Sequence, residues 1–150
     1  MEKLHFSKVI NAPKEKVWNA MLGERSYMEW TRVFGEGSHY KGTWKKGSKI
    51  LFLAPGKSGS MEGMVSRIAE NKPYNYISIE HLGLVHDGKE DTQSDAVKGW
   101  AGAFENYTFK EKDTKTELHI DVDANEEFKD MFASIWPKAL DKLKEIAEKK

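Results

Sequence analysis

The C-terminal stretch, residues 125–150, constrains the fold more than any other part of the chain. Its apolar residues recur in steps that alternate between three and one, with a single exception, which is the pattern of one apolar helix face. Asn125 is a natural N-cap, and Glu126 and Glu127 place negative charge on the first turn. We therefore predict a long amphipathic helix that needs a large apolar partner from the rest of the chain. Its apolar face consists of Phe128, Met131, Phe132, Ile135, Trp136, Ala139, Leu140, Leu143, Ile146 and Ala147.

Pro137 lies inside this predicted helix. A proline lacks the backbone N–H, and its ring would crowd the carbonyl group of Ala133. Two helices, the second beginning at Pro137, are therefore an alternative. Because the apolar spacing does not slip across Pro137, we favour one helix with a kink.

Length and composition limit the class of protein. We expect 150 residues to form one domain, residues 1–150, with enough chain for a core. The 24 basic residues balance the 24 acidic ones, which argues against a dedicated partner among nucleic acids or anionic membranes. The lack of cysteine excludes disulfides and thiolate metal sites. No apolar run resembles a signal peptide or a membrane span, so we expect a cytoplasmic protein.

The residues before the C-terminal helix show a different period. Residues 4–10 alternate like a strand, and two short apolar stripes at 17–22 and 27–30 predict two short helices after it. Further strands are predicted at residues 38–40, 49–54, 61–70, 74–82, 100–110 and 116–123. Short turns between them indicate an antiparallel meander, and the polar stretch 83–98 is expected to be a long loop. The predicted class is α+β, with about seven strands in one sheet whose dry face the last helix covers.

Glu105 is the most informative polar residue. By alternation it shares a face with Ala103 and Tyr107, which is the more apolar face of its strand. We expect an inward carboxylate here to be hydrogen-bonded or neutralised, and His81, inward by the same alternation, is the expected companion. The opposite register, with Phe104 inward and Glu105 in water, stays open. Spacing alone reveals no set of nucleophile, base and orienting residue.

Two other patterns in the sequence concern chemical sites. None of the five histidines lies at helical metal-ligand spacing, and the carboxylates near His81 and His86 do not fit a calcium loop. We therefore expect no metal site and no cofactor. The stretch Gly56-Lys57-Ser58 resembles the end of a phosphate-binding loop, but Leu51 stands where that motif needs glycine, so we interpret it as a hairpin turn.

Three stretches resemble a known family. Residues 10–18 (INAPKEKVW) are similar to the opening motif of the START-like (SRPBCC) superfamily. Trp100 with residues 105–108 (ENYT), and residues 136–143 (WPKALDKL), resemble the branch that contains the C-terminal domain of the heat-shock chaperone ATPase activator. The resemblance covers nearly the whole chain. It implies a helix-grip fold, in which a curved sheet wraps around the last helix with an apolar cavity between them, and it implies no particular catalytic set.

The leading functional hypothesis is a module that binds an apolar or amphipathic small molecule of unknown identity between sheet and helix. One alternative is an enzyme of the polyketide cyclase or hydrolase kind that uses Glu105 and His81 as acid and base. Another is a domain that acts on a chaperone through its outer surface, and a filled core without a cavity also stays open. The predicted ligand-binding residues are Trp30, Phe52, His81, Glu105, Tyr107, Phe128, Phe132 and Trp136.

Overall fold

One curved antiparallel sheet dominates the computed structural model of the chain, which describes residues 1–149. Across these residues it contains eight strands in the order β1-β8-β7-β5-β4-β3-β2, and β6 pairs with the end of β5. The prediction of an α+β fold with an antiparallel meander is confirmed. The strands are β1 (Glu2–Ile10), β2 (His39–Gly42), β3 (Lys49–Pro55), β4 (Met61–Lys72), β5 (Tyr76–His86), β6 (Lys89–Asp91), β7 (Ala103–Lys112) and β8 (Lys115–Ala124).

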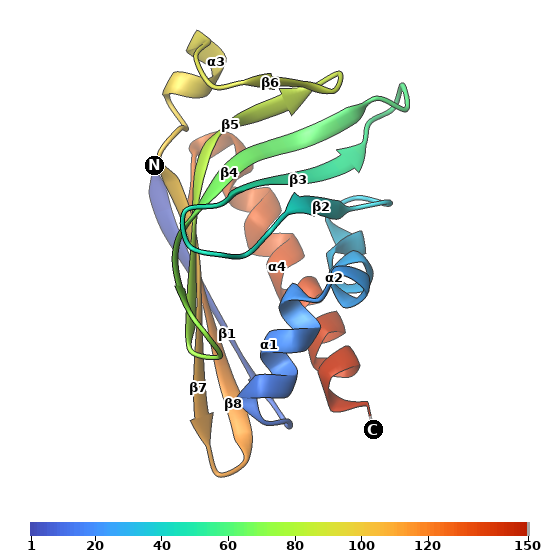
Figure 1. Cartoon of the computed structure of the whole chain (residues 1–150), viewed down its shortest axis with the longest axis vertical. Coiled ribbons are helices and arrows are strands. Elements are labelled where there is room, and N and C mark those ends of the chain that lie inside the picture. The colour runs from blue at the N-terminus through green and yellow to red at the C-terminus, as the bar shows by residue number, and fades with distance from the viewer. Residues whose placement is uncertain (150) are drawn as a thin grey trace.

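Except for the short helix at residues 95–98, the helices gather on the concave face of this sheet (Figure 1). Figure 1 shows β1, β7 and β8 standing along one side of α4, while β3 and β4 bend across the top. Helix α4 contacts β1, α1 and α2, so the sheet and two short helices enclose it. The fold is therefore the predicted helix grip. The helices are α1 (Lys14–Leu22), α2 (Glu24–Trp30), the short 3₁₀ turn η1 (Thr31–Val33), α3 (Asp95–Lys98) and α4 (Glu126–Glu148).

Helix α4 begins as its sequence predicts. The Asn125 side chain accepts a hydrogen bond from the backbone N–H of Phe128 at 3.0 Å, which satisfies one of the free donors of the first turn. Pro137 lies inside one continuous helix, so the alternative of two helices is wrong. Lys150, the last residue of the predicted helix, lies outside the described residues. No helix among residues 1–149 has both the length and the apolarity needed to cross a membrane.

The predicted long loop at residues 83–98 is wrong. Strand β5 continues to His86, a two-residue turn follows, and β6 pairs back onto β5 with His86 opposite Lys89. The turn residues Asp87 and Gly88 have φ values of 50° and 76°, which is the backbone that Asp-Gly favours in tight hairpins. This Asp-Gly signal was overlooked because polar residues surround it. Helix α3 then occupies residues 95–98, and β7 begins at Ala103 rather than at residue 100.

Burial along α4 is uneven. Trp136, Ala139, Leu140, Leu143 and Ala147 are buried in the main core with residues of β1, α1, β5 and β8. The predicted apolar face begins at Phe128, however, and the first turns of α4 leave Phe128 and Met131 largely exposed. The expected burial of these two side chains is therefore wrong. In Figure 1, α1 and α2 lie beside the second half of α4 and not beside its first turns.

Candidate functional site

A pocket of about 240 Å³ lies between the concave face of the sheet, α2 and the first half of α4. Its walls are mostly aromatic and aliphatic, with a few polar groups at defined places, which is the composition of a small-molecule site. The lining residues come from nine elements and the segments between them. They are Tyr27, Trp30, Thr31, Phe34, Ser38, His39, Phe52, Leu53, Ala54, Glu62, Gly63, Met64, His81, Trp100, Glu105, Tyr107, Val122, Asp123, Phe132 and Trp136.

Seven of the eight residues predicted from the sequence line this pocket: Trp30, Phe52, His81, Glu105, Tyr107, Phe132 and Trp136. The exception is Phe128, which is 38% exposed and lies outside the lining. It stacks on Phe132, one turn further along α4, with the ring centroids 6.3 Å apart. The structure thus brings together residues from α2, β3, β5, β7 and α4. Phe128, in contrast, lies on the solvent-exposed side of α4, outside the pocket.

A chain of hydrogen bonds runs along one wall of the pocket. Ser66 Oγ lies 2.7 Å from His81 Nδ1, and His81 Nε2 lies 3.2 Å from Glu105 Oε1. The Tyr107 hydroxyl donates to the other oxygen, Glu105 Oε2. Because an ionised carboxylate only accepts, Nε2 is the histidine nitrogen that carries the proton shared with Glu105. The inward register of Glu105 is the one that the structure adopts, with His81 and a tyrosine as its partners.

The pairing register of β4, β5 and β7 brings these hydrogen-bonded side chains together. Ile79 pairs with Glu105 and His81 with Ala103, so His81 and Glu105 project from the same face of neighbouring strands. On the other side of β5, Val65 pairs with Gly83 but Ser66 pairs with His81, so the register shifts by one residue between them. This irregularity places the hydroxyl group of Ser66 beside the imidazole of His81.

Burial governs the electrostatics of the tyrosines in this wall. Tyr107 and Tyr27 are both buried, and burial raises the pKa of each phenol well above 10. The negative charge of Glu105 raises the pKa of both groups further, because a second negative charge nearby is unfavourable. Both tyrosines therefore stay protonated, and Tyr107 remains a hydrogen-bond donor to Glu105.

The order Ser66, His81, Glu105 resembles the connectivity of a hydrolase triad, but the geometry does not fit that role. Ser66 is completely buried and does not line the pocket, so its hydroxyl cannot reach a bound substrate. The serine instead holds the imidazole ring in place. Glu105 accepts one hydrogen bond on each oxygen and retains further lone pairs for a donor inside the pocket.

Several polar and aromatic residues of the pocket wall were not predicted from the sequence. Trp100 stacks on His81, with ring centroids 5.4 Å apart and planes inclined by 13°, although it lies outside β7. Asp123 accepts from the backbone N–H of Phe104 at 2.9 Å and pairs with Lys3 at 2.9 Å. Burial raises the pKa of Asp123, but these two contacts outweigh it and lower the pKa overall. Only Trp100 carried a sequence signal, as part of the family motif.

A curved antiparallel sheet that grips a long C-terminal helix, with a pocket between them, defines a START-like (SRPBCC) helix-grip protein. Within that class, the chain belongs to the family described as Activator of Hsp90 ATPase homolog 1-like protein, whose model matches residues 11–148. The predicted family branch is therefore confirmed. None of the curated proteins matches the chain significantly.

Several solved structures share this fold. The Aha1 dimer from Colwellia psychrerythraea is similar, with a TM-score of 0.74 and 16% identity over 99% of this chain and 97% of that one. Protein CV1439 from Chromobacterium violaceum has a TM-score of 0.72 and 22% identity over 99% and 98%. DynU16, from the dynemicin biosynthetic locus, has a TM-score of 0.68 and 13% identity over 99% of this chain and 48% of that one. At these identities the likeness shows the fold alone.

Proposed function

We propose that the protein binds a small, mostly apolar molecule between the sheet and α4, and that it performs no chemistry on it. The single observation that carries this proposal is the pocket of about 240 Å³, whose mostly aromatic wall includes the hydrogen-bonded carboxylate of Glu105. A core selected only for stability would be filled, because unfilled volume costs free energy.

The polar groups of the pocket indicate which polar functional group the ligand should carry. Glu105 is 15% exposed at its side chain and faces the pocket with unused lone pairs. A ligand hydroxyl or amine would satisfy those lone pairs, whereas a ligand carboxylate would be repelled. The volume lies just below the ~300–1,000 Å³ common for ligand pockets, so we expect ligands of one or two rings rather than sterols.

A stability screen tests this proposal. Flat one- and two-ring compounds would be compared as matched sets that carry a hydroxyl, an amine or a carboxylate. Ligands that bind the folded state raise the melting temperature by mass action, and we expect this for the hydroxyl and amine members. The proposal is contradicted if no compound in any set raises the melting temperature or changes tryptophan fluorescence.

Comparing the ligand affinity of two variants tests whether binding occurs in the pocket. Glu105→Gln removes the charge at almost constant volume, and we expect about a ten-fold loss of affinity for the amine set, the scale of one hydrogen bond to a charged group. Glu15→Gln makes the same change at an exposed position of α1 and should leave affinity unchanged. Equal losses in both variants would show that binding depends on net charge and not on the pocket.

A second candidate function is interaction with a heat-shock chaperone in the cytoplasm. The family description names an activator of the Hsp90 ATPase, and the first half of α4 exposes two large apolar side chains, Phe128 (38%) and Met131 (42%). Exposed apolar side chains that lie together can form part of a protein interface. If this surface docks on the chaperone, the wild type should stimulate chaperone ATP hydrolysis and the double variant Phe128→Ser, Met131→Ser should not. Equal rates with and without the wild type would exclude this function.

A further inference from the structure

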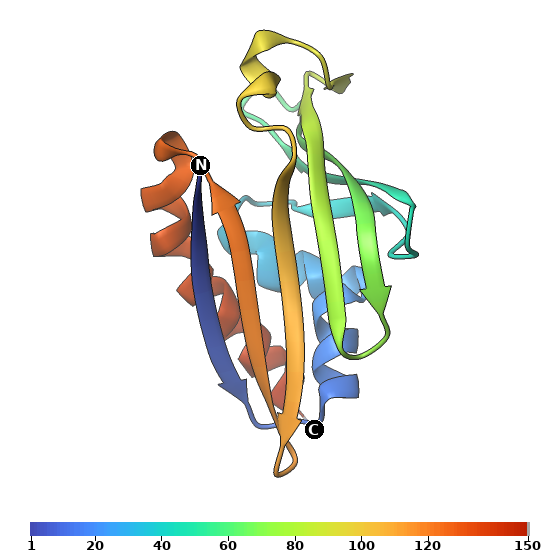
Figure 2. The same cartoon turned by 90° about the vertical axis from the view of Figure 1, so that its left-hand side faces the viewer.

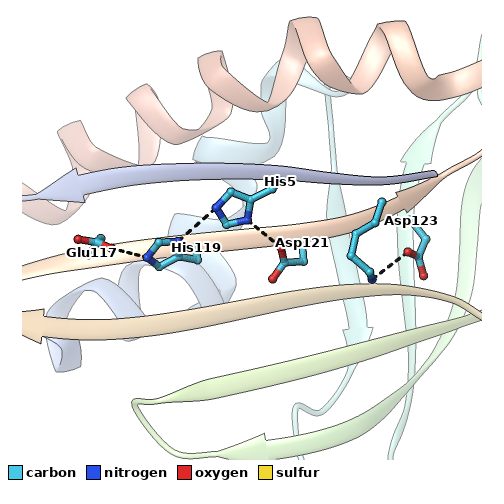
Figure 3. Close-up of polar contacts among 6 residues, drawn as sticks. His5, Glu117, His119, Asp121 and Asp123 are labelled. Carbon is cyan, nitrogen blue, oxygen red and sulfur yellow. Dashed lines mark hydrogen bonds and ion pairs between the residues drawn. The ribbon is translucent and has the colours of Figure 1, made fainter.

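A line of four titratable side chains crosses the outer face of the sheet, on the side away from α4 (Figure 3). His5 Nδ1 lies 2.7 Å from Asp121 Oδ1, and His119 Nε2 lies 2.5 Å from Glu117 Oε1. Between these two pairs, His119 Nδ1 faces His5 Nε2 at 3.4 Å. The two imidazole rings stack with their centroids 5.3 Å apart.

The pairing of β1 with β8 brings these residues together. His5 is directly opposite Asp121, and Ser7 is opposite His119, so the two histidines are diagonal neighbours. Alternation sends the side chains of all four residues to the outer face, which Figure 2 shows as the side where β1, β8 and β7 lie next to one another. Spacing along the chain could not reveal this contact, because 114 residues separate the two histidines.

The positions of the N–H protons on His5 and His119 leave room for a cation between the two rings. Ionised carboxylates only accept hydrogen bonds, so His5 donates from Nδ1 to Asp121, and His119 donates from Nε2 to Glu117. In a neutral imidazole the second nitrogen is an acceptor, so the two facing nitrogens then both present lone pairs. Two lone pairs that face each other at 3.4 Å repel one another, and a cation between them, either a proton or a metal ion, would satisfy both.

We propose that His5 Nε2 and His119 Nδ1 bind a divalent transition-metal ion that accepts imidazole ligands in tetrahedral geometry, such as Zn²⁺, with water completing its coordination. Two nitrogen ligands at ~2.0–2.1 Å in tetrahedral geometry lie about 3.3–3.4 Å apart. The observed separation of 3.4 Å matches this value. The ion would take the position of the shared proton.

The surroundings of both histidines support this assignment. Histidines that bind metals commonly donate their other N–H to a carboxylate, which fixes the ring and makes the ligating nitrogen more basic. Asp121 and Glu117 make this contact for His5 and His119 respectively. The His5 side chain is 54% exposed, so an ion can reach the pair from solvent. The two carboxylates also supply negative charge beside the ion.

A second group of possible ligands provides the control. Glu62, His86 and Asp87 offer ligand atoms within 4.8 Å of one another at the β5–β6 turn. This group has one histidine, and both of its ring nitrogens already contact carboxylates, at 2.7 Å from Glu62 and 3.3 Å from Asp87. It therefore lacks a facing pair of free nitrogens. His86→Ala removes an exposed histidine, as His5→Gln does, without touching the proposed site.

Calorimetric titration of the untagged, chelator-treated protein with Zn²⁺ tests the proposal. We expect one site in the wild type and in His86→Ala, and at least a ten-fold weaker affinity in His5→Gln and His119→Ala. Asp121→Ala should weaken binding about ten-fold, because Asp121 positions a ligand without touching the ion. Binding that is absent at millimolar Zn²⁺, equal in wild type and His5→Gln, or lost only in His86→Ala would overturn the proposal.

A stability readout uses the same variants. The ion would link the edge strand β1 to β8, so Zn²⁺ should raise the melting temperature of the wild type and of His86→Ala. His5→Gln should fold, as far-ultraviolet circular dichroism would show, because it keeps a polar side chain at an exposed position. An equal rise in its melting temperature would contradict the assigned ligands.

Discussion

The two ends of the layer between sheet and helices use similar residues but are filled differently. Near the end of α4, Met21 and Leu143 are completely buried in a continuous core. Near the start of α4, the same apolar spacing leaves Phe128 and Met131 exposed, and a pocket of about 240 Å³ remains beside Phe132. The closed end is a structural core, and the open end has the features of a binding site.

The difference arises from the neighbours of α4 and not from α4 itself. Helices α1 and α2 contact α4 and close the layer around its second half, where its buried residues lie. At the open end the sheet bends over α4 instead, as Figure 1 shows, and a curved sheet cannot follow a rigid helix along its whole length. Apolar spacing therefore predicts which face of a helix is available for packing, but not how far its partner extends.

The largest expected effect comes from the closed end. Leu143→Ala removes a completely buried side chain where neighbours surround it, so we expect the free energy of unfolding to fall by about 2–5 kcal/mol. Urea unfolding followed by circular dichroism measures this change. A loss below about 1 kcal/mol would mean that this end is not tightly packed.

The buried tyrosines of the open end should make stability depend on alkaline pH. The folded pKa values of Tyr27 and Tyr107 are raised, chiefly by burial, above the value of about 10 in the unfolded chain. Their contribution to stability is therefore complete below pH ~10 and is lost as the pH rises from there toward the folded pKa. Phenolate absorbance should show that these two of the five tyrosines ionise only as the chain unfolds. Ionisation of all five in a chain with native circular dichroism would contradict their burial.

A milder effect is expected at the pocket wall. Phe132 is partly buried and lines the pocket, so its ring lacks the full set of neighbours that a core residue has. We expect Phe132→Ala to reduce the free energy of unfolding by about 1–2 kcal/mol, less than Leu143→Ala in the same urea assay. A loss as large as that of Leu143→Ala would mean that the open end is packed as tightly as the closed end.

The smallest effect is expected on the exposed side of α4. Phe128→Ser should change the free energy of unfolding by no more than about 0.5 kcal/mol, because surface substitutions rarely exceed that range. Ligand affinity should also stay constant, since Phe128 lies outside the pocket. Affinity reduced in this variant as strongly as in Phe132→Ala would mean that the pocket extends past its present edge.

Much of this architecture could be predicted from periodicity. The period of two places Ile77, Ile79 and His81 on the inner face, and the same reasoning chose the register that brings Glu105 inward. The Asp87-Gly88 hairpin was missed because its second strand, β6, is only three residues long and polar, although the dipeptide itself is a turn signal.

Other contacts depend on the assembled sheet and could not be predicted from spacing. Ser66 meets His81 only because the β4–β5 register shifts beside it, and Trp100 stacks on His81 from a segment outside any strand. The approach of His5 to His119 depends on the register between the first and last strands. Pairing between strands far apart in the sequence decides all of these contacts.

The central claim is that small apolar molecules bind at the open end of the layer, and the five tryptophans report on it directly. Trp30, Trp100 and Trp136 line the pocket, and Trp44 packs against the lining residue Phe52, whereas Trp18 packs against Phe109 outside the lining. The indole N–H signals in a ¹⁵N–¹H correlation spectrum would be assigned by single substitution and followed during titration with a ligand from the stability screen. We expect the three pocket signals to shift in a saturable way while that of Trp18 stays in place. A saturable shift of the Trp18 signal with the pocket signals unchanged would contradict this account.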